Sequence, residues 1–143
     1  MKTNRHLFAV VTIIFALSAA AFSQALPDKS VVVFGAKINY VETGDATKPT
    51  VIFLHGLGGS VANWQMNTAA FAQNYRVIAI DQVGFGKSDK PTLKYRVATF
   101  VDFLDKFMSE LKIEKASLVG NSMGGWVAAL MAMISVHAQS IAR

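Results

Sequence analysis

The amino-acid sequence predicts an α/β fold with a mainly parallel sheet and flanking helices, and two observations predict it. Short apolar runs of strand length alternate with helix-length patterns, which is typical of parallel strands joined by right-handed crossovers. The stretch 116–132 shows this most clearly, with a short strand, a tight turn at Ser122 and a helix that begins at once. With 143 residues and 52% hydrophobic content, the chain is expected to form one domain with a sizeable core.

The first 25 residues carry the pattern of a secretory signal peptide. Lys2 and Arg5 precede an apolar run over 7–22, and a small-residue segment ending at Ala25 follows. We expect cleavage near Ala25 and an exported protein, periplasmic or extracellular, without stable membrane association after cleavage. The alternative is an uncleaved membrane anchor over 7–22, which is disfavoured because a span needs about 20 apolar residues.

The charge and the cysteine content argue against a nucleic-acid partner and against disulfides. Without the predicted leader, Lys and Arg fall from 14 to 12 against 9 Asp and Glu, so the net charge falls from +5 to +3. The positive charges are scattered along the sequence, and we therefore expect no nucleic-acid partner. The chain has no cysteine, which excludes disulfides.

The expected elements follow the leader in order. Strands over 31–34 and 37–41 flank Gly35 and predict a hairpin. The continuous apolar run 51–54 predicts a strand buried on both faces, and the segment 76–80 predicts another buried strand. The segment 61–73 between them predicts a helix. An amphipathic helix is predicted over 97–112, because apolar residues recur there at helical spacing: Phe100, Val101, Leu104, Phe107, Met108 and Leu111.

The pattern Gly-x-Ser-x-Gly between a strand and a helix predicts a nucleophile elbow centred on Ser122. The turn is expected to hold Ser122 at a strained, positive φ that lifts its hydroxyl clear of the sheet edge. Gly120 and Gly124 are then needed because strand and helix pass within contact distance of each other. The helix start directs backbone N–H groups at the reaction centre, which favours negative charge on a substrate oxygen.

Two phosphate-binding motifs are partly matched, so a nucleotide-binding domain is kept as a weaker alternative. The segment 56–58 follows a strand and Asp81 ends the next, as in a dinucleotide fold, but Val61 occupies the third glycine position. Its bulk opposes the close helix–strand packing of that motif. The segment 86–88 suggests a P-loop, but Asp81 occupies the first glycine position there.

Three motifs in order, 55–59, 81–88 and 120–125, together resemble the α/β-hydrolase fold family over roughly residues 31–135. The resemblance implies that residues 26–143 form a partial domain, the truncated first half of that fold. It implies Ser122 as the catalytic nucleophile and the backbone N–H groups of Leu57 and Met123 as the oxyanion hole. The residues that support these motifs are His55, Gly56, Gly120 and Gly124.

The resemblance also implies an activity. The expected reaction is hydrolysis of an ester or a related carbonyl compound, with carbon–carbon bond cleavage as a further option. The substrate is expected to be a small, apolar molecule, and no metal or cofactor is implied. Ser122 argues against relatives with an aspartate nucleophile, such as dehalogenases and epoxide hydrolases. His55 is expected to brace its turn, and Asp81 and Ser88 to tie down their own loop.

The base and the acid of a serine-hydrolase triad are not evident. The family order is nucleophile, acid, histidine, and no Asp or Glu follows Met123. His137 follows Ser122 by 15 residues along one predicted helix, about 22 Å at ~1.5 Å per residue, so it cannot be the base. We therefore expect the N-terminal part of a longer hydrolase, inactive as given. The alternative is a non-catalytic truncated domain with a binding or vestigial role.

Nothing in the sequence follows the elbow helix to cover it. We expect an exposed strand edge at 117–121 and an uncovered apolar helix face at 127–134, and such features promote association.

Overall fold

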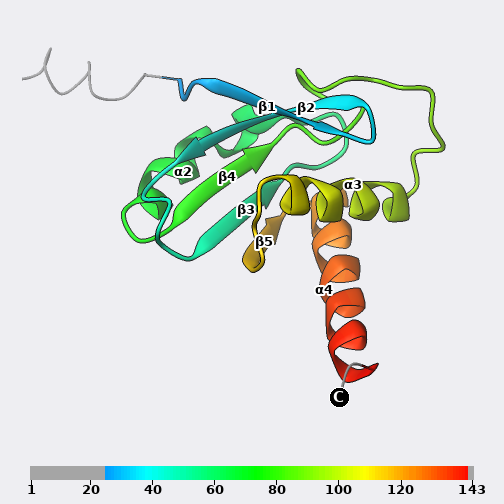
Figure 1. Cartoon of the computed structure of the whole chain (residues 1–143). Helices are drawn as coiled ribbons and strands as arrows, with labels where there is room; N and C mark the ends of the chain where they lie inside the picture. Colours follow the sequence, from blue (N-terminus) through cyan, green and yellow to red (C-terminus); the bar gives the residue numbers. More distant parts are fainter. Residues whose placement is uncertain (1–24, 142–143) are drawn as a thin grey trace, which may run out of the picture.

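The structure, a computed structural model, describes residues 25–141, and side chains within it from 25 to 134. The signal peptide and the alternative anchor over 7–22 lie outside the described residues. Within them, no helix has the length and apolar character that crossing a membrane requires. The elements are β1 (Asp28–Val33), β2 (Ala36–Thr43), β3 (Thr50–Leu54), the 3₁₀ helix η1 (Val61–Trp64), α2 (Gln65–Ala72), β4 (Arg76–Ile80), α3 (Val97–Glu110), β5 (Ala116–Gly120) and α4 (Met123–Ile141) (Figure 1).

The five strands form one mixed sheet in the order β1-β2-β4-β3-β5. β4, β3 and β5 are parallel, as the alternation of strands and helices predicted. β1 and β2 form the predicted hairpin, and β2 also pairs antiparallel with β4. Two of the four strand pairings are parallel and two are antiparallel, so the sheet is mixed rather than mainly parallel as expected. Its turn is made by Phe34 and Gly35, with φ of 49° and 81°.

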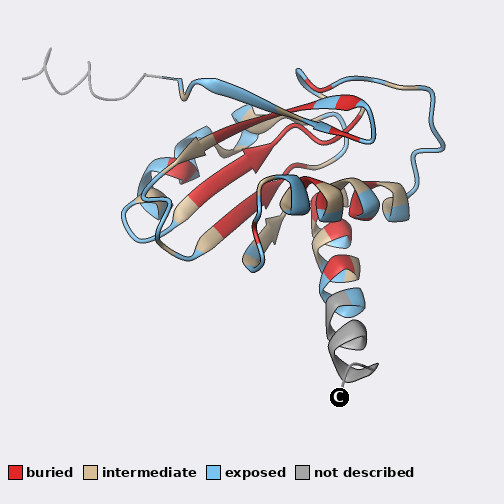
Figure 2. Ribbon diagram, in the orientation of Figure 1, coloured by how far each residue is buried: buried red, intermediate tan, exposed pale blue. Residues whose placement is uncertain are grey.

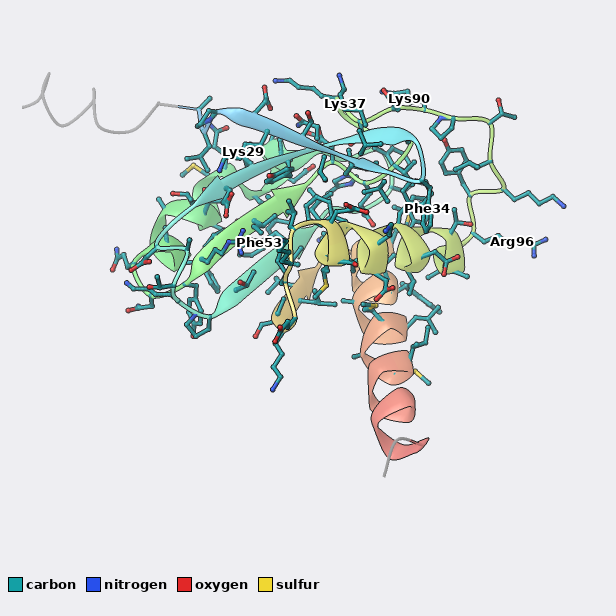
Figure 3. The ribbon with its side chains drawn as sticks, in the orientation of Figure 1. Lys29, Phe34, Lys37, Phe53, Lys90 and Arg96 are labelled. Carbon is teal, nitrogen blue, oxygen red and sulfur yellow. The ribbon has the colours of Figure 1, made fainter. Side chains whose placement is uncertain are left out.

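The larger core lies between the sheet and the helices α3 and α4 (Figure 1). The predicted apolar stripe of α3 faces it, with Phe100, Val101, Leu104 and Phe107 buried. Phe34 from the hairpin turn contacts Phe103 edge-on at 5.2 Å and so ties the hairpin to α3 (Figure 3).

A smaller core covers the opposite face of the sheet, beneath η1 and α2. Alternate residues of β3 point into the two cores, with Ile52 and Leu54 on one side and Val51 and Phe53 on the other. This explains the continuous apolar run in β3, since both faces are covered. The predicted helix over 61–73 is split, because Ser60 and Asn63 form a capping box around the short η1 turn.

β5 and the outer part of α4 are less covered than the rest. β5 pairs only with β3 among the described strands, and Figure 2 shows it partly exposed beside the buried β3 and β4. On α4, the exposed apolar side chains are Trp126, Met133 and Ile134. The predicted open edge is therefore confirmed for the described residues. The helix face expected over 127–134 is uncovered only in part, because Val127 and Met131 are buried in the larger core.

Candidate active site

Ser122 lies in a sharp turn between the end of β5 at Gly120 and the start of α4 at Met123. Its φ is 50°, the positive value that the flanking glycines predicted. The turn closes through the N–H groups of Gly124 and Gly125, which donate to the carbonyl oxygens of Asn121 and Ser122 at 2.9 Å. Ser122 itself is exposed. The hydroxyl is thus held at the surface by a strained backbone.

The glycines of the elbow are required by close backbone contact. A Cβ on Gly120 would lie 2.2 Å from the carbonyl carbon of Gly124, and a Cβ on Gly124 would lie 2.1 Å from the carbonyl oxygen of Leu54. Gly125 differs, since its Cβ would meet nothing closer than 3.4 Å. Gly120 and Gly124 are therefore fixed by the crossing of β5, the end of β3 and α4, whereas Gly125 is not.

The loop after β3 lies against the elbow. A Cβ on Gly56 would lie 3.2 Å from the Cβ of Ser122 and 3.1 Å from Oδ1 of Asn121, and the Asn121 N–H donates to the Leu54 carbonyl at 3.0 Å. In the described part of the chain, the N–H of Leu57 has no hydrogen-bond acceptor. The N–H of Met123, at the first position of α4, has none either.

His55 is enclosed and both of its ring nitrogens are used. Its side chain has no exposed surface. The backbone N–H of Gln82 donates to Nε2 at 3.0 Å, so Nε2 carries no proton and Nδ1–H donates to the Gly56 carbonyl at 2.7 Å. Burial lowers the pKa of His55 below its usual value, although the Gly56 hydrogen bond and the Asp81 charge oppose this. Through these two bonds the ring joins the loop after β3 to the loop after β4.

A second buried polar cluster joins the loop 81–88 to the sheet. The Asp81 carboxylate accepts hydrogen bonds from the backbone N–H groups of Val61 and Lys87 at 2.7 and 2.8 Å and from the Asn39 side chain at 2.9 Å. Ser88 donates to the Asp81 carbonyl and accepts from the Asn39 N–H. The expected loop-tying role of Asp81 and Ser88 is confirmed, and it extends to β2 and η1.

This cluster also bears on the nucleotide-binding alternative. Both carboxylate oxygens of Asp81 are engaged inside the protein, and the residue is 1% exposed. The carboxylate therefore cannot hydrogen-bond a ribose hydroxyl, as a dinucleotide fold requires.

Asn39 was missed by sequence reasoning. The only signal was a single amide at an interior position of a strand, which has no local meaning until its partner 42 residues away is known.

Among the described residues, the structure brings neither a base nor an acid of a triad to Ser122. His137 falls on α4, the same helix that Ser122 precedes, as predicted. The two tryptophans differ in their surroundings. Trp64 packs at a tilt against Phe53 in the smaller core, with ring centroids 4.8 Å apart, and Trp126 is 73% exposed. Among the described residues, no group of His, Asp and Glu could hold a metal ion.

A large open cleft lies elsewhere, over the face of the sheet that carries α2. Its lining includes Ala25, Leu26 and Asp28, residues of η1 and α2, and Lys87, but not Ser122.

Comparison with known proteins gives one fold family but several activities, and the relatives include epoxide hydrolases and a haloalkane dehalogenase. Residues 49–142 match the family model described as "alpha/beta hydrolase fold". A curated relative is the 2-hydroxy-6-oxo-6-(2'-aminophenyl)hexa-2,4-dienoic acid hydrolase of Metapseudomonas resinovorans, 39% identical over 95 residues, which are 64% of this chain and 32% of that protein.

Two solved structures are similar. One is a bacterial membrane phospholipase A, with a TM-score of 0.73 and 29% identity over 90% of this chain and 47% of that one. The other is the enol-lactonase of Burkholderia xenovorans, with a TM-score of 0.67 and 28% identity over 69% of this chain and 39% of that one. The chain thus spans about a third of the curated relative and less than half of either structure.

Proposed function

The chain belongs to the alpha/beta hydrolase fold family, and we propose that it is the N-terminal part of a serine hydrolase acting on an ester or a related carbonyl compound. The observation that carries the proposal is the conformation of Ser122, an exposed serine held at a φ of 50° directly before a helix. The N–H groups of Leu57 and Met123 supply donors without an acceptor close to the same turn. A nucleophile beside two free N–H donors suits acyl transfer.

In the proposed mechanism, Oγ of Ser122 attacks the carbonyl carbon of the substrate and loses its proton to a base. The N–H groups of Leu57 and Met123 donate hydrogen bonds to the oxyanion that forms. Collapse of this tetrahedral intermediate breaks the bond to the leaving group and leaves an acyl group on Ser122, which water then hydrolyses.

The base is assigned outside the 143 residues. His55 cannot take the proton because both ring nitrogens are hydrogen-bonded within the protein. His137 is about 22 Å along α4 from Ser122 at ~1.5 Å per residue. We therefore place the histidine and the acid that orients it in further polypeptide of the whole hydrolase, and expect the present chain to lack enzymatic turnover.

The substrate class rests on the relatives. Their names describe a hydrolase of an oxo-dienoic acid, an enol-lactonase and a phospholipase A. These three names share a carbonyl compound, and we propose that the substrate here is a small, apolar carbonyl compound.

Stabilisation of an anion at position 122 is tested by titrating a thiol placed there, a measurement that does not depend on a catalytic base. The sequence has no cysteine, so Ser122→Cys carries a single thiol, and Ser117→Cys on exposed β5 is the matched control. We expect the pKa of the thiol at 122 to fall below the ordinary value of about 8.5, because the helix start and nearby N–H groups favour the thiolate. A pKa no lower than that of the control would refute anion stabilisation and favour the non-catalytic alternative.

We further propose that the protein is exported, on the pattern of residues 1–25. N-terminal sequencing of the protein from its native host should find a start near residue 26. An intact Met1 on a cytoplasmic protein would contradict export, and an intact Met1 on a membrane fraction would favour the anchor over 7–22.

A further inference from the structure

The carbonyl oxygen of Gly56 is held by two donors. Nδ1–H of His55 donates to it at 2.7 Å and the N–H of Gly59 at 3.0 Å. The Gly56–Leu57 peptide is trans, and in a trans peptide the C=O and N–H bonds point in opposite directions. The N–H of Leu57 is therefore directed away from the His55 ring, and within the described residues it meets no acceptor.

The donor nitrogen of His55 is set by a second contact. The Gln82 N–H can only donate, so its 3.0 Å bond to Nε2 leaves Nδ1 as the protonated nitrogen. The Gln82 side chain returns a bond of 2.7 Å to the His55 carbonyl and fixes the two backbones together. The ring is fully buried and packs edge-on against Phe85 at 5.7 Å. Position and tautomer of the imidazole are thus both determined by the protein.

We infer that His55 is a positioning residue, locked by Gln82 in the Nδ1–H tautomer so that it holds the Gly56 carbonyl and thereby aims the Leu57 N–H at the oxyanion site. The inference rests on the proposed function in assigning that N–H to an oxyanion. On this inference His55 does more than brace its turn, because the orientation of the Gly56–Leu57 peptide depends on which ring nitrogen carries the proton.

Two substitutions separate positioning from bracing. In His55→Asn, the amide nitrogen takes the place of Nδ1 and can still donate to Gly56, but the bond from Gln82 is lost. In His55→Gln, the amide oxygen takes the place of Nε2 and can still accept from Gln82, but the bond to Gly56 is lost. Each variant removes one buried hydrogen bond, so a merely structural role would affect both alike.

The orientation of the Leu57 N–H is measured by its residual dipolar coupling in weakly aligned, ¹⁵N-labelled full-length chain. We expect wild-type and His55→Asn proteins to give the same coupling and His55→Gln to give a different one. Retention of the wild-type coupling in folded His55→Gln would overturn the inference.

A measurement on the unsubstituted chain decides the case in which His55→Gln does not fold. The ¹⁵N shifts of the His55 ring should show protonated Nδ1 and bare Nε2, and the opposite tautomer would overturn the inference.

The thiol titration then separates this inference from the proposed function. In the Ser122→Cys background, His55→Gln should raise the thiol pKa toward that of Ser117→Cys, more than His55→Asn does. If the thiol pKa at 122 is ordinary from the start, the proposed function fails, while the tautomer and the coupling still test the positioning.

Discussion

At the scale of single residues, Gly124 is the position of the elbow where an added side chain is tolerated least. We expect Gly124→Ala to cost about 1–3 kcal/mol of unfolding free energy, the usual range for overpacking, because its Cβ would meet the rigid Leu54 carbonyl at 2.1 Å. Gly125→Ala is the matched control. Its Cβ has room, so we expect a stability within about 1 kcal/mol of wild type, on the stabilising side, as helix propensity favours alanine. Urea unfolding measures both, and equal losses would contradict the packing explanation.

His55 gives the stability a pH dependence. Its pKa is lowered in the folded chain, so the unfolded chain binds the proton first as the pH falls. The stabilising contribution of neutral His55 is therefore complete above the ordinary pKa of about 6.5 and is lost as the pH falls through the folded pKa.

The measurement is urea unfolding at about pH 7.5 and about pH 5, a window above the ordinary titration range of carboxylates near pH 4. The pKa of Asp28 is lowered by its hydrogen bond from Lys87, and burial raises the pKa of Glu42 but the hydrogen bonds of Lys29 and Arg76 lower it more, so both carboxylates remain charged throughout it. We expect the free energy of unfolding to fall more in wild type than in His55→Asn. An unchanged pH slope in the variant would show that His55 does not titrate on unfolding.

Local chemistry explains which site residues the sequence could predict. Ser122, its positive φ and the two elbow glycines follow from five consecutive residues, so they were predictable. The tautomer of His55 and the role of Asn39 depend on Gln82 and Asp81, 27 and 42 residues away in the chain. Hydrogen bonds over such separations have no sequence period, and only the fold brings the partners together.

At the scale of elements, the same distinction holds. Strands and helices were placed within a few residues because each has its own apolar pattern. The insertion of β2 beside β4 was not predicted, because antiparallel pairing between strands that are far apart in sequence leaves no local signal. The division of one predicted helix into η1 and α2 turned on the capping contacts of Ser60 and Asn63.

The open edge of β5 and the exposed face of α4 predict self-association of the leader-free chain, residues 26–143. Unpaired strand edges and contiguous apolar side chains both favour it. Met133→Glu, at a side chain that is 69% exposed on α4, should reduce association by adding a charge to that face. Met66→Glu, at a methionine 78% exposed on α2, is the control and should change it little.

Sedimentation at several concentrations measures the effect. A soluble, monomeric and cooperatively unfolding wild-type chain would contradict this prediction, and equal effects of the two variants would show that general charge rather than the α4 face is responsible.

At the scale of the whole molecule, the proposed function gives the chain one part of a catalytic apparatus. Ser122 and the donors of Leu57 and Met123 meet at one corner of the sheet, while the large cleft lies over the face that carries α2. Serine hydrolases deprived of their base keep roughly 10³–10⁴-fold rate enhancement over water from binding and the oxyanion hole alone. That remaining rate enhancement is the most that the geometry of this chain supports.

We therefore expect no enzymatic turnover of a short-chain activated ester by the purified chain. Hydrolysis should stay well below about 1 s⁻¹, the low end of ordinary enzymes, because a serine hydroxyl is a weak nucleophile without a base and His55 has no free ring nitrogen. The assay compares the chain with Ser122→Ala and His55→Ala. Turnover above that rate that vanishes in Ser122→Ala would contradict the prediction. Its simultaneous loss in His55→Ala, in protein that remains folded, would mean that the imidazole leaves its bonds to Gly56 and Gln82 and acts as the base.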